Sequence, residues 1–71
     1  MGAMRESSLE AAILALLGEG KDLEALLLAL KPRFPRLSRA RLFGLLVRMR
    51  RRGLVVYREG RFLRAEEAHH P

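Results

Sequence analysis

The 71-residue chain has no cysteine and a formal net charge of +6, from fourteen basic and eight acidic residues. This length allows one small hydrophobic core, and the lack of cysteine excludes a disulfide framework and a thiolate metal site. No apolar run approaches the roughly 20 residues of a membrane span and the N-terminus does not resemble a signal peptide, so we expect a cytoplasmic protein. Twelve of the basic residues are arginine, a bias that indicates a GC-rich and thermophilic source.

Positive charge is concentrated in the second half of the chain. Residues 1–30 carry a net charge of −3, and residues 31–64 carry +11 because twelve basic side chains stand against Glu59 alone. Residues 65–71 contribute −2. A basic block of this size is typical of a polyanion-binding surface, and the plainer alternative is a solvated basic face without a ligand.

We expect one folded domain over residues 7–65. Residues 1–6 begin with Met-Gly-Ala-Met, which resembles a cloning scar, so a disordered N-terminus or tag remnant is expected there. Residues 66–71 have no hydrophobic periodicity and are expected to form a mobile tail.

The first predicted helix starts near Ser8. Ser7 stands three residues before Glu10 and an apolar run follows, which is the pattern of a capping box. The expected core stripe consists of Leu9, Ile13, Leu16 and Leu17. The other side of the helix is also uncharged and carries Ala11, Leu14 and Ala15. A helix that is apolar all round is normally buried all round, so we expect this second side to be covered.

A second helix is predicted from Leu23 to Leu30, after a turn that ends at the N-cap Asp22. Its core residues are Leu23, Leu26, Leu27 and Leu30, and its uncharged back carries Ala25, Leu28 and Ala29. One small core cannot hide the backs of both helices, so a homodimer is expected. The residues assigned to its interface are Ala11, Leu14, Ala15, Ala25 and Leu28. The alternative is that the following connector folds back with Phe34 and covers the second helix within one chain.

Residues 31–37 form the connector to the third helix. The helix before it ends at Lys31-Pro32, because a residue that precedes proline is pushed out of the helical region. Phe34 is expected to plug the core. The basic residues of the connector are Lys31, Arg33 and Arg36, and they either clamp phosphates or are solvated loop charges.

The third predicted helix runs from Arg39 to Arg52, with Ser38 as its N-cap and Gly53 as a left-handed stop. Its core stripe consists of Leu42, Leu45, Leu46 and Met49. The opposite face carries small and basic residues, namely Ala40, Arg41, Gly44, Val47, Arg48 and Arg51. Small residues allow a partner to approach the backbone, and guanidinium groups fit phosphate oxygens or a guanine edge.

Two strands, residues 54–58 and 61–65, are predicted around the two-residue turn Glu59-Gly60. A loop of this length pairs Arg58 with Arg61, Tyr57 with Phe62, Val56 with Leu63 and Val55 with Arg64. We expect Val56 and Leu63 to face the core together with Leu54. Tyr57 and Phe62 would then lie on the outer face beside Val55 and Arg64, where they either stabilise the hairpin or form a partner-binding patch.

The sequence around the third helix resembles the winged helix-turn-helix family, and most of all the small bacterial regulators of the PadR and MarR kind. The residues that carry the resemblance are Leu37-Ser38 at the start of the helix and Arg52-Gly53-Leu54-Val55 at its end, followed by a basic hairpin. The resemblance covers roughly residues 8–65 and implies a mainly helical fold of order α-α-α-β-β. It makes residues 39–52 the recognition helix and residues 58–61 the wing tip. The sequence departs from the family in its long connector and in having no C-terminal dimerisation helix.

The function expected from these features is DNA-binding transcriptional regulation by a protein that is not an enzyme and has no cofactor. Both histidines lie in the tail, so neither a metal site nor a catalytic triad is expected. Arg41 and Arg48 should reach base edges, and without Asn or Gln direct readout should favour guanine. The full set of residues expected to bind DNA is Ser38, Arg39, Ala40, Arg41, Gly44, Arg48, Arg51, Arg52, Arg58 and Arg61.

Two other functions remain open at the level of sequence. A winged helix also serves as a protein-interaction module, which here would dock on a larger nucleoprotein complex through Tyr57, Phe62 and the apolar helix backs. RNA binding is the third possibility, although one tyrosine and three phenylalanines offer few stacking platforms.

Overall fold

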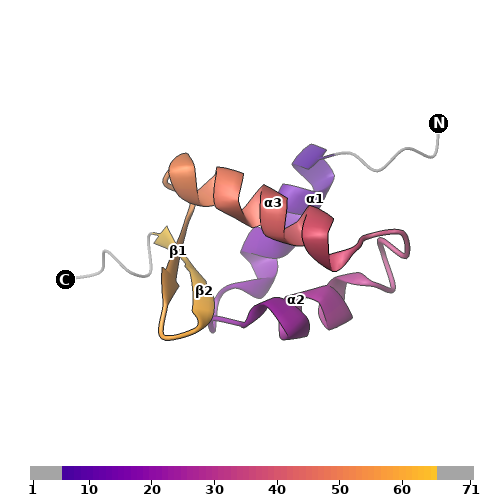
Figure 1. Ribbon diagram of the computed structural model, residues 1–71, viewed down its shortest axis with the longest axis horizontal. Helices are drawn as coiled ribbons and strands as arrows, with labels where there is room; N and C mark the ends of the chain where they lie inside the picture. Colours follow the sequence, from indigo (N-terminus) through magenta and orange to yellow (C-terminus); the bar gives the residue numbers. More distant parts are fainter. Residues whose placement is uncertain (1–5, 66–71) are drawn as a thin grey trace.

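The computed structural model describes residues 6–65, which form three helices followed by a two-stranded antiparallel hairpin (Figure 1). The elements are α1 (Glu6–Leu16), α2 (Leu23–Leu30), α3 (Arg39–Arg51), β1 (Val55–Arg58) and β2 (Arg61–Arg64). This order confirms the predicted mainly helical α-α-α-β-β fold. Residues 1–5 and 66–71, on which the expected tag remnant and tail fall, lie outside the described residues. Within residues 6–65, no helix has the length and apolar character needed to cross a membrane.

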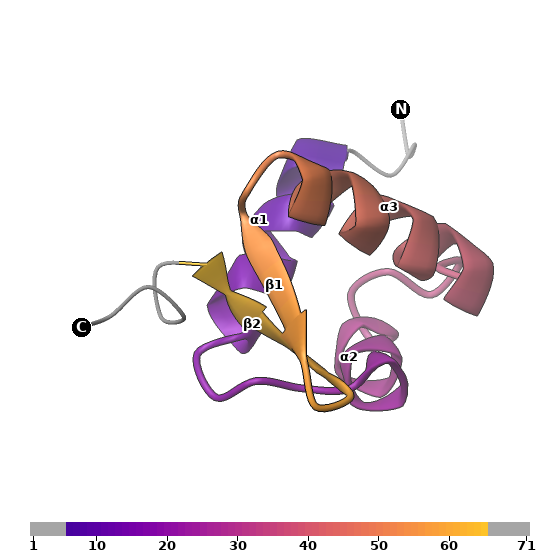
Figure 2. The same cartoon turned by 60° about the vertical axis from the view of Figure 1, so that its left-hand side comes forward.

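The core lies between the three helices and is closed at one end by the hairpin. In Figure 1, α3 runs across the upper part of the molecule with α1 behind it and α2 below, and Figure 2 brings the hairpin to the front. α3 packs against α2 and β1, and α1 packs against α2. The fully buried residues of α3 are Leu42, Leu45, Leu46 and Met49, which confirms the predicted stripe.

α1 begins earlier than the sequence indicates. Glu6 is already helical, so Ser7 lies inside the first turn and the predicted capping box at Ser7 is wrong. Both Ser7 and Ser8 are exposed, and their hydroxyls can stay hydrated without interrupting the helix. Leu9, Ile13 and Leu17 are buried as expected, and Leu16 is partly buried against the same core.

The caps of α2 and α3 follow the sequence prediction. The Asp22 carboxylate accepts a hydrogen bond of 2.7 Å from the Ala25 N–H, and the Ser38 hydroxyl accepts one of 3.1 Å from the Arg41 N–H. At the other end of α3, Gly53 adopts φ +79°, and the Leu54 N–H donates to the Met49 carbonyl at 2.9 Å. This is the Schellman arrangement that glycine favours, because a Cβ atom is strained at positive φ.

The connector is a compact turn rather than an open loop. The Phe34 N–H donates to the Leu30 carbonyl at 2.8 Å, and the partly buried Phe34 ring packs against the core as predicted. Leu37, for which the sequence analysis expected no role in the core, is fully buried. It directly precedes the N-cap Ser38, and Leu42 follows at the fourth helical position, which is the spacing of a hydrophobic staple.

The hairpin has the predicted register but the opposite face turned inward. All four predicted cross-strand pairs are present. Val55 and Phe62 are buried, at 1% and 5% exposure, whereas Val56 and Leu63 are only partly buried, so the expected inner face is wrong.

A contact between distant segments accompanies the reversal. Lys21 and Phe62 exchange backbone hydrogen bonds of 3.0 and 2.8 Å, which fixes β2 beside the segment before α2.

Candidate nucleic-acid interface

The side of α3 opposite its buried stripe is called here the outer face, and it consists of Ala40, Arg41, Gly44, Arg48 and Arg51. These side chains are exposed, apart from Gly44, which is partly buried. Val47, which was predicted on the same face, is partly buried and lines the groove described below. A Cβ atom built on Gly44 would meet nothing within 4 Å outside the helix backbone, so packing within the chain does not require glycine there. The glycine lowers the surface between flanking arginines, which favours close approach of a partner.

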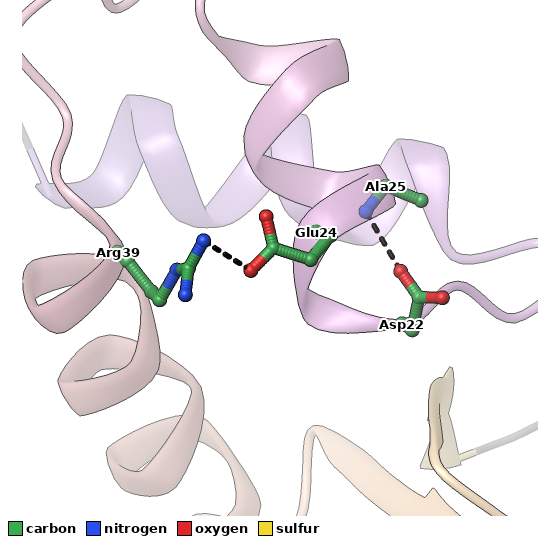
Figure 3. A network of polar contacts seen from close by, with 4 residues as sticks. All are labelled: Asp22, Glu24, Ala25 and Arg39. Carbon is green, nitrogen blue, oxygen red and sulfur yellow. Dashed lines mark hydrogen bonds and ion pairs between the residues drawn. The ribbon is translucent and has the colours of Figure 1, made fainter.

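Two of the arginines expected to bind DNA also join α3 to the other helices. Arg39 forms an ion pair of 2.5 Å with Glu24 at the start of α2, as Figure 3 shows beside the Asp22 cap. Arg52, just after α3, donates to Glu10 of α1 at 2.8 Å. Glu10 is only 16% exposed, so the second pair is better shielded from solvent than the first. These contacts tie both ends of α3 to the helices that pack against it.

The hairpin tip presents two arginines. Glu59 and Gly60 have φ values of +54° and +81°, which is the pattern of a type I′ turn. Arg58 and Arg61 pair across the strands directly below this turn, and both are exposed. The tip therefore places two guanidinium groups together at one end of the molecule.

The connector bases differ in their surroundings. Lys31 donates to the Pro35 carbonyl at 3.3 Å, which closes the turn on itself. The Arg33 guanidinium lies 5.5 Å from the centroid of the Phe34 ring, within cation–π distance. Arg36 is exposed. Lys31 and Arg33 thus make contacts within the connector. For Arg36 the structure shows only a solvent-exposed position.

A groove of about 570 Å³ lies along one flank of α3, between the start of α2 and the hairpin. It is lined by Asp22, Leu23 and Glu24, by Phe43, Val47 and Arg50 of α3, and by Tyr57, Gly60 and Phe62 of the hairpin. Phe43 is 52% and Tyr57 51% exposed, although large apolar side chains are usually covered. Neither Phe43 nor Arg50 was among the predicted site residues. The signal for Phe43 was present in the sequence, because a phenylalanine directly after Leu42 falls outside the core stripe.

The aromatic pair of the hairpin is present, but it does not lie on the outer face of the hairpin, where we expected it. The Tyr57 and Phe62 rings have their centroids 4.8 Å apart and are inclined at 56°. Because Phe62 is buried, only Tyr57 offers aromatic surface to a partner. The pair therefore stabilises the hairpin and also supports one wall of the groove.

The uncharged helix backs are open to solvent in the single chain. Leu28 is 77% exposed, and Ala11, Ala15, Ala25 and Ala29 are exposed as well. The alternative in which the connector covers α2 is therefore wrong, because Phe34 packs on the core and leaves Leu28 uncovered. Leu14 differs from the others in that it is partly buried against the core.

Among residues 6–65, no three His, Cys, Asp or Glu side chains form a group that could hold a metal ion. Comparison of the chain with protein-family models, curated proteins and solved structures found no match.

Proposed function

We propose that the chain is a DNA-binding transcriptional regulator of winged helix-turn-helix type. The outer face of α3 would enter the major groove while the hairpin tip contacts phosphates beside it. The observation that carries the proposal is the outer face itself, where Arg41, Arg48 and Arg51 are exposed beside a glycine that packing does not require. An arginine cluster around a low surface fits a nucleic-acid groove better than it fits an apolar partner.

The charge distribution supports the same function. Residues 31–64, with a net charge of +11, include all of α3, the connector and the hairpin. Neutralisation of DNA phosphates by such a surface releases condensed counterions, so affinity should be largely electrostatic. Arg51 and the tip residues Arg58 and Arg61 are assigned to phosphates.

Arg41 and Arg48 are assigned to base edges. Each guanidinium can bind guanine O6 and N7 together, a contact worth about 1–3 kcal/mol of discrimination against other bases. The chain has no asparagine or glutamine to read adenine in the same bidentate way. We therefore expect operators in which guanine occupies the directly read positions.

Substitutions at Arg41 test this assignment. Arg41→Ala should weaken binding to a guanine-containing site and flatten the preference at one position, measured by fluorescence anisotropy over a set of single-base variants. Arg41→Lys is the matched control, because lysine keeps the charge but loses the bidentate fork. It should retain affinity for random duplex while losing the preference. An Arg41→Ala protein with wild-type affinity and wild-type base preference would contradict the placement of α3 in the DNA major groove.

A homodimer is part of the proposal. The exposed backs of α1 and α2 would meet across a two-fold axis, with Leu28 near its centre. Such a dimer would present two recognition helices about 34 Å apart, one helical turn of DNA. Leu28→Glu should convert the dimer to a folded monomer by light scattering, since the exposed side chain is not needed by the core. A wild-type protein that is monomeric at micromolar concentration would contradict the dimer.

Protein docking is a second candidate function, and one observation favours it. The large apolar side chains that are exposed within residues 6–65 are Leu28, Phe43 and Tyr57, and two of them line the groove. Apolar surface of this kind is typical of protein-interaction sites. The salt dependence of binding affinity distinguishes the two functions. Docking through apolar side chains would be nearly insensitive to ionic strength, whereas duplex binding would weaken as the salt concentration rises.

A further inference from the structure

The groove between α2, α3 and the hairpin is chemically distinct from the outer face of α3. The outer face is basic, whereas the groove has aromatic rings, one arginine and two carboxylates around a volume of about 570 Å³. Small-molecule pockets have volumes on the order of 300–1,000 Å³. We propose that this groove binds one unpaired base of a single-stranded DNA segment, a site beyond the duplex-binding surface described above.

Two aromatic rings supply stacking surfaces. Phe43 projects from α3 and Tyr57 from β1, both line the groove, and each is about half exposed. The Tyr57 ring is backed by buried Phe62 at 4.8 Å between centroids, so its orientation is supported from behind. Stacking on a fixed ring costs little conformational freedom and suits any base, because every base has a π-face.

The cations around the groove suit a phosphate chain. Arg50 lines the groove, and within residues 6–65 its side chain makes no hydrogen bond or ion pair with another residue. Arg58 and Arg61 flank Gly60, which is itself a lining residue at the hairpin end. A strand that inserts one base would thus have guanidinium groups available for the phosphates on either side of it.

The carboxylates of the opposite wall suit a base edge rather than a phosphate. Asp22 uses one oxygen, Oδ1, to cap α2, and Glu24 uses Oε2 to pair with Arg39 (Figure 3). Among residues 6–65, the second oxygen of each group has no such contact and can accept an N–H from an inserted base. Guanine carries adjacent N–H donors at N1 and N2, whereas thymine has one. The site should therefore prefer guanine, with its edge toward α2 and its phosphates toward α3 and the hairpin.

Duplex DNA cannot use this site. In a duplex the faces of each base are stacked and its hydrogen-bonding edge is paired, so neither is available to the rings or to the carboxylates. The inference therefore does not depend on the outer face. Either surface can fail its test while the other passes.

The chain offers an internal reporter for the experiment. Tyr57 is the only tyrosine and there is no tryptophan, so intrinsic emission reports the groove. The probes are a seven-nucleotide thymine strand with one central guanine, the all-thymine strand, and the duplex of the first strand with its complement. The guanine strand should quench Tyr57 emission in a saturable way and bind more tightly than the thymine strand. The duplex should change anisotropy without the same quenching.

Phe43→Leu is the decisive variant, because leucine keeps the apolar bulk and removes the stacking face. Its affinity for the guanine strand should fall about 5- to 100-fold, as expected for loss of one stacking platform. Phe43→Tyr is the matched control and should retain binding. Because it adds a second tyrosine, the variants are compared with wild type by the anisotropy of a labelled strand, and thermal melting should show that both are folded. Arg41→Ala should leave the guanine preference of the single strand unchanged while it weakens the duplex.

Four results would overturn the proposal. The first is a Phe43→Leu protein that binds the guanine strand as tightly as wild type. The second is equal quenching by the duplex and by the single strand. The third is saturable quenching by a leucine-rich amphipathic peptide that is tighter than the guanine strand and unaffected by Phe43→Leu, which would make the groove a protein-docking site. An RNA strand of the same sequence that binds while the DNA strand does not would also contradict it.

Discussion

The two exposed sides of α3 differ in what surrounds them. On the outer face Arg41 and Arg51 are exposed, and a Cβ atom at Gly44 would meet nothing within 4 Å outside the helix backbone. The groove side, with Phe43 and Arg50, is walled by the start of α2 and by the hairpin. One side is therefore suited to a broad polyanion and the other to a single planar group.

This difference shows which surface properties of a helix can be predicted from the sequence of that helix alone. The spacing of apolar residues separates buried from exposed positions, because the period of the helix alone sets that division. It does not separate one exposed flank from the other. That distinction depends on which residues α2 and the hairpin bring alongside.

The largest expected effect comes from the buried side of α3, because the packing of this side holds the helix, and with it both exposed sides, in place. Leu46→Ala should lower the free energy of unfolding by about 2–5 kcal/mol, because Leu46 is fully buried and its loss leaves a cavity. Val47→Ala is the matched neighbour and should cost much less, since Val47 is only partly buried on the groove flank. Urea denaturation followed by circular dichroism measures both. Equal losses for the two variants would contradict the assignment of inner and outer sides.

Gly44→Ala should affect stability and binding in opposite directions. Alanine in a helix interior is favoured over glycine by about 0.5–1 kcal/mol, and no neighbour obstructs a Cβ atom at this position. The variant should therefore melt at a higher temperature than the wild type. Binding to duplex DNA should weaken if the glycine admits the DNA surface. A variant that is more stable and binds duplex unchanged would show that no partner approaches α3 there.

The smallest effects should come from the ion pairs that position α3. Arg52→Ala removes the contact with partly buried Glu10 and should cost up to about 1 kcal/mol of unfolding free energy. Arg39→Ala removes a pair in which both partners are more than half exposed, so its cost should be close to zero. Thermal melts at low and high salt compare them. A larger loss for Arg39→Ala would reverse this ranking.

Much of the fold was predictable because local rules act on neighbouring residues. Asp22 and Ser38 cap their helices as expected, and Gly53 ends α3 in the left-handed region. The strand register followed from the two-residue turn at Glu59-Gly60.

The errors arose where distant segments meet. The inner face of the hairpin was reversed because Lys21 pairs with Phe62, a contact between residues far apart in the sequence. The groove was missed for the same reason, since Phe43 and Tyr57 come together only in the folded chain. The ion pairs of Arg39 and Arg52 were not foreseen either, because their acidic partners lie on other helices. Leu37 could have been found from the hydrophobic-staple spacing with Leu42.

The central claim is that the basic half of the chain binds duplex DNA through several phosphates at once. A salt titration of wild-type protein against random duplex measures this directly, as the slope of log binding constant against log salt concentration. With about five phosphate contacts the slope should lie near −4 to −5. A protein that shows no binding to duplex at about 50 mM salt, where phosphate contacts are little screened, would contradict the claim and favour the docking function.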